Sequence, residues 1–479
     1  MNQENSGKIS GSLEQDMAYL NRVLDVNRNF DIIYRVIHIG GKEACMYLVD
    51  GFCKDEMMQK ILQYFMDLTP DDMPEDMHGI SKKFTPYVEV EINDQYETII
   101  HSLLSGMFIL LIDGYSKALL IDSRTYPARG VEEPEKDKVL RGSKDGFVET
   151  VVFNTALIRR RIRSADLHME MLTAGESSRT DIVLCYMDQR VDHQFLDTVK
   201  QKINGIKADA LTMNQESLAE CLYQRKWYNP FPKFKYTERP DAAAAQVLEG
   251  NIVILVDNSP SAMILPTTIF DVVEEADDYY FPPITGTYLR ITRLIISILT
   301  YILTPTFLLL VNNSRWVPES FSFILLKEEP NIPLIWQFLI LELAIDGLKL
   351  AAINTPNMLS TPLSVLAALV LGEFSVNSGW FSAEVMLYMA FVAVANYTQQ
   401  NYELGYALKF MRILNLLLTQ WFGLWGYIAG ILITVLSIAC NKTVANRSYI
   451  YPLIPFNGKD LKNRVIRRRL PESLKNKEK

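Results

Sequence analysis

Three ionisable residues interrupt one long apolar stretch of the sequence, 333–353, which reads PLIWQFLILELAIDGLKLAAI. They are Glu342, Asp346 and Lys349. At 100° per residue, these side chains fall within an arc of about 60° on one face of a helix. Charged groups inside a membrane span are costly, so they face a bundle interior, a partner or a water-filled path. The stretch therefore predicts a membrane helix with a polar seam.

Two interpretations of this seam are open. The three residues can pair with one another along the helix, at spacings of three and seven, and stabilise assembly. Alternatively, Glu342 and Asp346 attract cations to a conducting path, which Lys349 tempers or gates. Glu373 is a further candidate for the ion path, but it lies near the end of its apolar stretch, where its side chain can reach water.

The seam belongs to a series of apolar stretches that occupies most of the region from 294 to 440. Stretches of this length and composition are typical of helices that cross a bilayer. A small-residue pair, Ala368 and Gly372, has the four-residue spacing that permits close contact between helices. The predicted spans are 294–311, 333–353, 363–376 and about 383–397, followed by 412–440, which is interrupted at Gly423–Gly426.

Basic residues predict the topology, because cytoplasmic flanks of membrane helices are rich in Lys and Arg. Arg290 with Arg293, Lys409 with Arg412, and the tail at 464–469 should face the cytoplasm. Four crossings return the chain to the cytoplasm before Lys409. The last stretch is then a hairpin or a set of interfacial helices, with both termini of the chain cytoplasmic.

The first half of the chain contains two similar β-hairpin patterns. Residues 106–122 and 250–266 match when shifted by 144 positions, with Gly, Asp and Ala in common. Each follows a helix-like stretch, and a second pair of hairpins is predicted at 30–50 and 167–188. The sequence predicts two related α/β subdomains before the membrane domain. Two unrelated hairpins with similar turns are the alternative.

A connecting segment lies between these subdomains, at 125–162. Its first part is rich in Pro, Gly and charge, which is typical of a linker, and a helix is predicted from Asp145 onward. The helix ends in a run of arginines. Such a run is usually a solvated face, but it can also pair with the acidic stretch at 132–137 or with acidic lipid. The candidate interface arginines are Arg159, Arg160, Arg161 and Arg163.

Composition excludes several other classes of function. The net charge is −8, and because residues 457–479 carry nine basic against three acidic residues, the remainder is near −14. So acidic a body is a poor partner for nucleic acid. The first residues lack the basic and apolar regions of a signal peptide. The scattered cysteines and histidines, and the absence of nucleotide-binding or hydrolase motifs, predict no enzyme, no metal and no cofactor.

Several long motifs together resemble one family. The runs RGVEEPEKDKVLRGSKDGFVETVVFNTALIRRRI, YTERPDAAAAQVLEGNIVILVDNSPSAMILPTTIFD, LAIDGLKLAAINTP and YPLIPFN are similar to the GerA-type A subunits of bacterial spore germination proteins. The resemblance covers nearly the whole chain after residue 30. The run FDIIYRVIHIGGKEACMYLVDGFCKDE favours the sporulation (AF-type) branch of the family. Nutrient-receptor A subunits tend to have Pro where Ser143 stands.

The resemblance implies a protein of the inner spore membrane, with cytoplasmic α/β subdomains and a multi-span domain. It also implies homo-oligomers that conduct cations, and other spore germination membrane proteins as partners. We therefore predict a monovalent cation channel component. The rival functions are a non-conducting scaffold that assembles receptors and, last, an ion or solute transporter, which would need inverted repeats in the membrane region.

The predicted fold class is an α+β cytoplasmic region of two related subdomains followed by an all-α membrane domain. The predicted boundaries are 1–29 for an N-terminal tail or helix, 30–125 for the first subdomain, 126–164 for the linker and Arg-rich helix, 165–285 for the second subdomain, 290–442 for the membrane domain and 443–479 for a basic tail.

Overall fold

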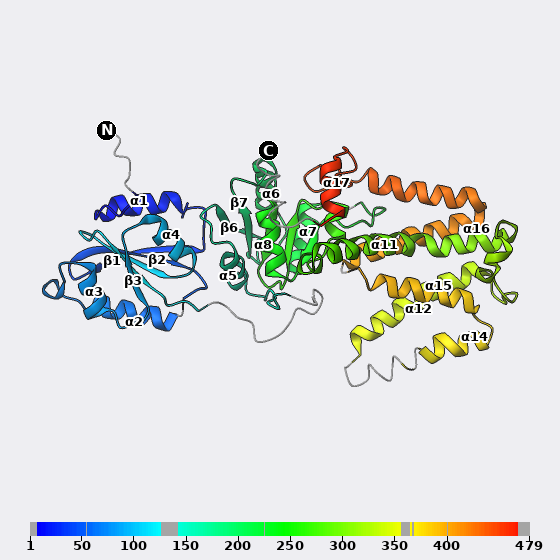
Figure 1. Cartoon of the computed structure of the whole chain (residues 1–479), viewed down its shortest axis with the longest axis horizontal. Coiled ribbons are helices and arrows are strands. Elements are labelled where there is room, and N and C mark those ends of the chain that lie inside the picture. Colours follow the sequence, from blue (N-terminus) through cyan, green and yellow to red (C-terminus); the bar gives the residue numbers. More distant parts are fainter. Residues whose placement is uncertain are drawn as a thin grey trace. The chain divides into compact units, whose positions relative to one another are not determined.

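The chain folds into two compact units (Figure 1). The computed structural model describes residues 7–53, 55–125, 142–224, 226–355, 365, 368–399 and 401–467. The first unit, here the α/β unit, comprises Met1–Gln224 and Phe234–Pro266. The second, here the helical unit, comprises Arg225–Lys233 and Thr267–Lys479. A short segment from the middle of the chain therefore packs with the helical unit.

The α/β unit contains two five-stranded antiparallel sheets, which confirms the predicted α+β region. Their strand orders are β1-β2-β4-β5-β3 and β6-β7-β9-β10-β8, so the second sheet repeats the topology of the first. The strands are β1 (Ile32–Ile39), β2 (Lys42–Val49), β3 (Val90–Asn93), β4 (Phe108–Ile112), β5 (Ala118–Ile121), β6 (Leu167–Ala174), β7 (Thr180–Met187), β8 (Lys235–Thr237), β9 (Ile252–Val256) and β10 (Ala262–Leu265).

The repeat extends to the backbone of the central hairpins. Strands β4 and β5 begin 144 residues before β9 and β10, which is the shift seen in the sequence. Gly106 and Gly250 both have positive φ, +98° and +96°. The turn residues Gly114 and Asn258, also 144 apart, share the left-handed conformation that Gly and Asn tolerate best. Matched topology and matched turns favour related subdomains over unrelated hairpins.

Helices cover both faces of each sheet in the same arrangement. In the first sheet, α1 and α4 pack on one face and α2 and α3 on the other, as Figure 1 shows. In the second, α5 and α8 cover the face that corresponds to that of α1 and α4. The helices are α1 (Leu13–Val23), α2 (Asp55–Met66), α3 (Met77–Phe84), α4 (Tyr96–Leu104), α5 (Val151–Arg161), α6 (His193–Asn204), α7 (Asn214–Leu222) and α8 (Pro240–Leu248).

Two hairpin aspartates fix the starts of equivalent helices. The Leu13 N–H, at the start of α1, donates to Asp113 Oδ1, and the Val151 N–H, at the start of α5, donates to Asp257 Oδ1. A carboxylate at a helix N-terminus satisfies a free N–H group and interacts favourably with the helix dipole. Each aspartate therefore caps a helix as well as lying in a hairpin turn.

The helical unit contains three long helices, α11, α12 and α16, together with shorter ones. The helices are α9 (Ile269–Val273), α10 (Asp277–Tyr280), α11 (Pro283–Asn312), α12 (Leu334–Asn354), α14 (Ser375–Asn377), α15 (Ala383–Asn396), α16 (Tyr402–Ala439) and α17 (Gly458–Val465). Two of them, α11 and α16, are long and apolar enough to cross a membrane, and α15 is a shorter apolar helix. Of the predicted stretch 363–376, the structure describes residue 365 and a π-helical turn, Leu369–Phe374, within 368–376.

Helix α16 reverses direction at Gly423, which has φ +57° and ψ −132°. Gly426 then packs against the Leu418 carbonyl and Gly430 against the Asn415 side chain, so closely that a Cβ atom at either glycine would clash. The two halves of α16 therefore lie antiparallel, side by side. The reversal falls within the predicted Gly423–Gly426 interruption, and glycine supplies both the positive φ and the close approach.

Candidate charged site in the helical unit

Glu342 forms a buried ion pair with an arginine from another helix. Its Oε1 accepts from Arg412 Nε at 2.8 Å and from Nη2 at 2.5 Å. Arg412 is fully buried in α16, and its Nη1 donates to the Thr300 carbonyl of α11 at 2.9 Å. This one guanidinium therefore joins α11, α12 and α16. Planar, multidentate pairing of this kind is the geometry that arginine favours in buried sites.

Asp346 forms the second ion pair, one helical turn along α12. Its partner is Lys409 of α16, which is also buried. The Lys409 ammonium donates to the Glu342 carbonyl at 3.0 Å and lies 3.5 Å from Glu342 Oε2. Glu342 and Asp346, four residues apart on α12, thus face Arg412 and Lys409, which are three residues apart on α16.

Lys349 takes no part in these pairs. Its ammonium lies 5.4 Å from the ring centroid of Tyr397 and 5.8 Å from that of Tyr406, within the range of cation–π interaction. One interpretation of the seam was ion pairing among residues of α12. In the structure, the carboxylates of α12 instead form ion pairs with basic residues of α16. We call Glu342, Asp346, Lys349, Lys409 and Arg412 the charged cluster.

The charged cluster carries one excess positive charge if all five groups are ionised. Within one chain, it therefore does not present a free acidic surface to cations. Its geometry instead holds three helices together, because separating a buried pair leaves an uncompensated charge. Opening the cluster would expose two carboxylates at once.

Lys409 and Arg412 are the site residues that sequence reasoning missed. The topology argument placed them at the cytoplasmic end of a span, as basic markers. In the structure, they lie inside α16 and are buried. The signal that could have found them is their spacing of three, which complements the spacing of four between Glu342 and Asp346.

The remaining helical candidates lie apart from the charged cluster. Glu373 is exposed, as expected for a residue near a span end. Ala368 is exposed, and a Cβ atom built on Gly372 would meet no described atom within 4 Å. The predicted Ala368–Gly372 contact between helices therefore has no partner among the described residues of this chain. It stays a prediction for an assembled form.

The predicted interface arginines have a different role from the solvated face that the sequence indicated. Arg159 is fully buried and makes a bidentate pair with Asp31, at 2.7 and 3.0 Å. Arg161 bonds Asp145 at 2.9 Å, Arg160 is half-buried, and Arg163 is exposed. The ion pair between Arg159 and Asp31 links the two subdomains. The acidic stretch 132–137 lies outside the described residues.

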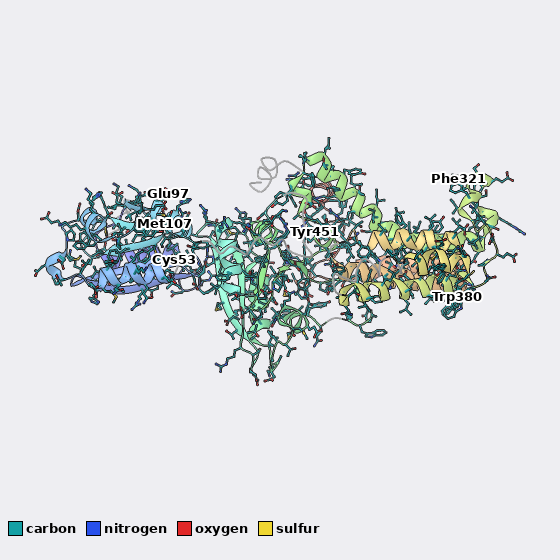
Figure 2. The ribbon with its side chains drawn as sticks, turned by 90° about the horizontal axis from the view of Figure 1, so that it is seen from below. Cys53, Glu97, Met107, Phe321, Trp380 and Tyr451 are labelled. Atoms are coloured by element: carbon teal, nitrogen blue, oxygen red, sulfur yellow. The ribbon has the colours of Figure 1, made fainter. Side chains whose placement is uncertain are left out.

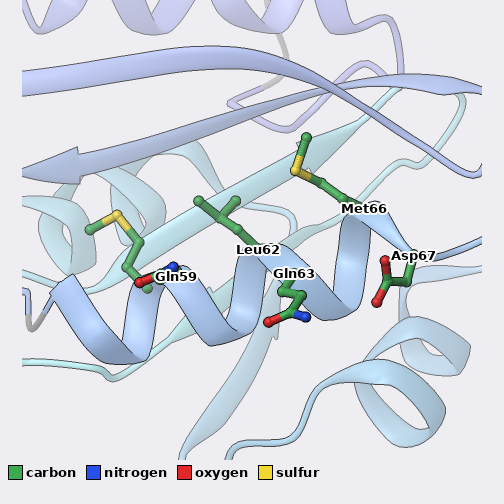
Figure 3. Close-up of a pocket in the computed structure, with 6 residues that line it drawn as sticks. Gln59, Leu62, Gln63, Met66 and Asp67 are labelled. Atoms are coloured by element: carbon green, nitrogen blue, oxygen red, sulfur yellow. The ribbon is translucent and has the colours of Figure 1, made fainter.

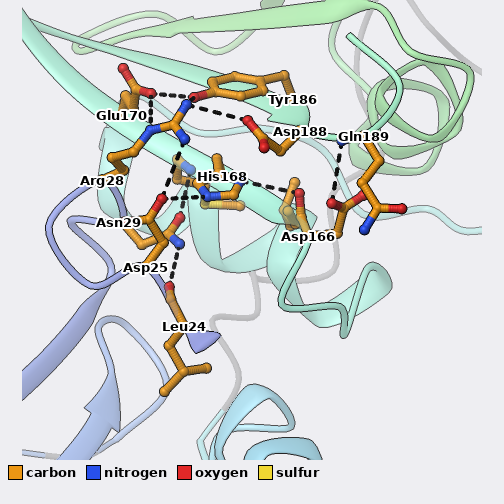
Figure 4. A network of polar contacts seen from close by, with 12 residues as sticks. Leu24, Asp25, Arg28, Asn29, Asp166, His168, Glu170, Tyr186, Asp188 and Gln189 are labelled. Carbon is orange, nitrogen blue, oxygen red and sulfur yellow. Dashed lines mark hydrogen bonds and ion pairs between the residues drawn. The ribbon is translucent and has the colours of Figure 1, made fainter. Parts of the chain in front are cut away.

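A second network of polar contacts joins the subdomains at β6 (Figure 4). The Arg28 guanidinium lies 3.3 Å from Glu170 and donates to Tyr186 at 2.9 Å, while His168 Nε2 lies 3.1 Å from Asp25. Burial opposes ionisation of Glu170, but hydrogen bonds from Lys200 and Tyr186 outweigh it and lower the pKa of this carboxyl. The network therefore favours a charged Glu170.

Acidic side chains also surround the start of α11. Arg290 and Arg293 are buried, and both pair with Asp278, at 3.1 Å in each case. Arg290 also reaches Glu274 at 2.6 Å, and Arg464 of α17 lies 3.1 Å from that glutamate. The basic residues that the sequence assigned to a cytoplasmic flank are thus neutralised by neighbours. They bind the C-terminal helix to the base of α11.

A hollow of about 550 Å³ lies along α2 (Figure 3). Its lining side chains are Met58, Gln59, Leu62, Gln63, Met66 and Asp67. Five of the six belong to α2 and Asp67 directly follows it, so among these lining residues no second element supplies the converging polar groups that define ligand sites. In the part of the chain that the structure describes, no group of His, Cys, Asp and Glu has a metal-binding arrangement.

Lys233 is a buried cation in the segment that packs with the helical unit. Its ammonium donates to Asn441 and to the Lys442 carbonyl and lies 5.4 Å from the Tyr449 ring centroid. Burial, followed by repulsion from Lys226, lowers the pKa of Lys233 to about 8. Phe231, two residues earlier, belongs to the apolar cluster around Tyr301.

This pKa predicts a pH dependence of stability. Between pH 10.5 and about 8, the unfolded chain protonates Lys233 but the folded chain does not, so stability falls as pH falls. We expect the difference in melting temperature between the native chain and Lys233→Met to change across this window and to be constant below it. Thermal unfolding in detergent measures it. Lys459→Met, which removes an exposed lysine, should show no such window, and a flat difference for Lys233→Met would contradict the prediction.

Comparison with known proteins places these features in a family. Residues 18–479 match the model of the Bacillus/Clostridium GerA spore germination protein family. The chain belongs to this family. The resemblance predicted from its motifs is confirmed.

The matched relatives include both branches that the motifs suggested. The chain is 35% identical to stage V sporulation protein AF of Bacillus subtilis (strain 168), over 95% of this chain and 92% of that protein. It is 25% identical to spore germination protein KA of the same organism, over 96% and 85%. Among solved structures, the N-terminal domain of the A subunit of the Bacillus megaterium spore germinant receptor GerK3 aligns with 54% of this chain and 95% of that chain, with a TM-score of 0.42 and 23% identity.

Proposed function

We propose that this chain is a multi-pass subunit of the spore germination apparatus in the inner spore membrane. In this proposal, copies of the chain assemble into an oligomer that passes monovalent cations, and both termini lie in the cytoplasm. Other spore germination membrane proteins are its partners. Family membership supports a role in spore germination. The helical unit supports a position in the membrane and the passage of cations.

The exposed surface of the helical unit supports embedding in lipid. Large apolar side chains point outward from each long helix, among them Ile298 of α11, Leu343 of α12, Leu387 of α15 and Leu432 of α16. Water-soluble monomers rarely expose continuous apolar surface of this extent. In a bilayer, the same side chains would contact acyl chains at no cost. The charges are held inside, as the membrane requires.

Aromatic residues at the helix ends support the same orientation. Trp316, Phe321 and Trp380 are exposed near one end of the helical unit, and Figure 2 labels the last two. Exposed Tyr397 follows α15 and lies beside Lys349, and exposed Tyr402 begins α16. Trp and Tyr concentrate where a bilayer meets water. We assign these two groups to the two membrane–water boundaries.

The charged cluster supplies a mechanism for conduction. In the closed form, Arg412 forms an ion pair with Glu342, and Lys409 forms one with Asp346. Movement of α12 away from α16 would release both carboxylates into a shared interior, where they would attract cations. Asp346 Oδ1 has no hydrogen-bond partner among the described residues, so part of this carboxylate is already uncommitted. The pairing across α12 and α16 is the single observation that carries this mechanism.

Recording from reconstituted protein in planar bilayers tests the proposal. The native chain should pass K⁺ or Na⁺ in preference to Cl⁻. The double variant Glu342→Gln/Asp346→Asn, which leaves Lys409 and Arg412 in excess, should lose cation conductance by at least tenfold. Assembly must be checked by native mass measurement. Unchanged conductance and selectivity in a correctly assembled double variant would rule out the cluster as the path.

A non-conducting scaffold is the second candidate function. One observation favours it: both carboxylates of the charged cluster are paired within a single chain. A scaffold predicts no conductance from the native chain, and normal germination from variants that keep the helices packed. Germination of spores that carry Glu342→Gln/Arg412→Gln, which removes one pair without leaving a charge, separates the two functions. Normal germination favours the scaffold.

A further inference from the structure

A short apolar loop protrudes from the helical unit after α16. It comprises residues 453–456, Leu-Ile-Pro-Phe, which belong to the YPLIPFN run of the sequence. All four residues are exposed: Leu453 is 43%, Ile454 56% and Phe456 74% exposed. Neighbouring large apolar side chains are costly to leave in water. This loop, here the apolar tip, therefore favours contact with an apolar surrounding.

Hydrogen bonds hold the apolar tip closed at its base. The Tyr451 hydroxyl donates to Asp460, and Asn457 Nδ2 donates to the same carboxylate at 2.8 Å. The Asn457 N–H also donates to the Pro452 carbonyl at 2.9 Å, which closes the loop across the tip. Asn457 Oδ1 then accepts from the Lys459 N–H at 3.2 Å and caps α17. The apolar side chains are therefore presented outward by a fixed loop.

The apolar tip lies at one end of the helical unit. Tyr449, four residues before the tip, is fully buried in an apolar cluster with residues of α11 and α16. Its N–H donates to the carbonyl of Asn441, two residues beyond the end of α16, at 3.2 Å. Figure 2 labels Tyr451 at the end of the unit away from Phe321 and Trp380. Because α16 enters the membrane in the proposed function, the tip then lies at a membrane–water boundary.

The charge around the apolar tip is basic. From 441 to 467, the sequence has six Lys and Arg residues and one acidic residue, Asp460, which is bound at the base of the tip. Lys459 and Lys462 of α17, just after the tip, are exposed. At the surface of a bilayer with acidic lipid, negative headgroups lie directly above acyl chains. The tip and its lysines together complement such a surface.

A second exposed segment of the same composition comes from the middle of the chain. Trp227 is 95% and Tyr228 60% exposed, and the Lys226 ammonium lies 5.8 Å from the Tyr228 ring centroid. Lys233, a few residues later, donates to the Lys442 carbonyl just beyond α16, so this segment is anchored at the same end of the helical unit. Trp and Tyr favour the boundary between a bilayer and water. Two segments far apart in the sequence thus combine apolar and basic side chains.

We propose that the apolar tip enters the headgroup region of a bilayer that contains acidic phospholipid, with Lys459 and Lys462 at its phosphates. The Trp227–Tyr228 segment enters the same region beside Lys226. The inference rests on the proposed function for the membrane position of the helical unit, and it adds the class of lipid that this end of the unit contacts. Each lysine near an acidic surface strengthens such binding about fivefold.

A fluorescent label on the apolar tip tests the inference in the full-length chain. Ile454→Cys, with the accessible cysteines Cys53, Cys221 and Cys440 replaced by Ser, accepts a polarity-sensitive dye. The protein is placed in nanodiscs of phosphatidylcholine, with or without phosphatidylglycerol. When phosphatidylglycerol is present, the dye emission should shift to shorter wavelength. Quenching of the dye by acrylamide, which is uncharged, should fall about twofold or more.

Two variants supply controls. Adding Lys459→Gln/Lys462→Gln should lower the ratio of inserted to free tip about 25-fold, fivefold for each lysine, and so remove most of the response to phosphatidylglycerol. A dye at Val88→Cys, a position of the α/β unit that is 97% exposed, should not respond to phosphatidylglycerol.

Emission typical of water from the Ile454→Cys label in phosphatidylglycerol bilayers would overturn the inference, as would an equal response with and without the two lysines. Shielding of the dye that requires added membrane protein instead of phosphatidylglycerol would also overturn it, in favour of a protein partner. Extraction with alkaline carbonate separates this inference from the proposed function. A chain that resists extraction while its tip stays in water keeps the membrane position and loses this contact. A lipid-dependent tip in a chain without conductance rejects the channel alone.

Discussion

Replacing Arg412 with leucine is expected to destabilise the helical unit by about 3–5 kcal/mol, because it leaves Glu342 buried without its partner. Arg412 also donates to the Thr300 carbonyl, so the substitution removes the contacts that join α16 to α11 and α12. The expected result is a lower melting temperature and a lower yield of folded protein in detergent. Intrinsic fluorescence and size-exclusion chromatography during heating measure both.

The double variant Glu342→Gln/Arg412→Leu is the control for this prediction. It removes both charges, so it should recover most of the lost stability. Replacing a buried pair by neutral groups is often close to neutral, whereas breaking one is costly. Lys349→Leu, which removes a half-buried cation from the same cluster, should have a small effect. If Arg412→Leu alone is as stable as the native chain, the buried pair does not hold the helices.

Replacing Arg159 with leucine should have an effect of similar size in the α/β unit, about 3–5 kcal/mol. Its bidentate bond to Asp31 joins the two subdomains, and the guanidinium also donates to the Leu167 carbonyl at 3.1 Å. Loss of the pair should let the subdomains separate before they unfold. Limited proteolysis, with fragments identified by mass, would detect earlier cleavage between 162 and 166.

Arg163→Ala provides the matched comparison, because this arginine belongs to the same run but is exposed. Exposed charge pairs contribute about 0–1 kcal/mol, so the substitution should leave proteolysis nearly unchanged. Equal sensitivity of the two variants would mean that the run acts as a whole, as a basic surface. In that case, the Asp31 pair would not be what fastens the subdomains.

The features predicted best from the sequence are hairpins and turns, which depend on residues close together in the chain. The hairpin at Phe108–Ile121 has apolar runs around an Asp-Gly turn, and its copy at Ile252–Leu265 has apolar runs around an Asp-Asn turn. The reversal in α16 was also predictable, because glycines interrupt an otherwise apolar run. In each case, the turn chemistry and the periodicity are local. The duplication then followed from comparing two local patterns.

The ion pairs depend on contacts that local patterns do not contain. Glu342 and Arg412 are 70 residues apart, and Asp31 and Arg159 are 128 apart. Periodicity predicts which face of a helix a charge occupies, but it does not predict which helix lies opposite. Lys409 and Arg412 were therefore assigned to a cytoplasmic flank, and Arg159 to a solvated face. For Arg159, the solvated face is replaced by a buried ion pair. Lys409 and Arg412 are also buried, and their side of the membrane stays a prediction.

Single-channel recording of Lys409→Met in planar bilayers tests the central claim most directly, namely that basic residues of α16 hold the carboxylates of α12 in a closed form. Removing this lysine frees Asp346 while Arg412 keeps the helices packed. We predict a higher open probability and stronger selectivity for cations over Cl⁻ than in the native chain. Recordings as silent or as unselective as those of protein-free bilayers, from oligomers verified by mass, would contradict the claim.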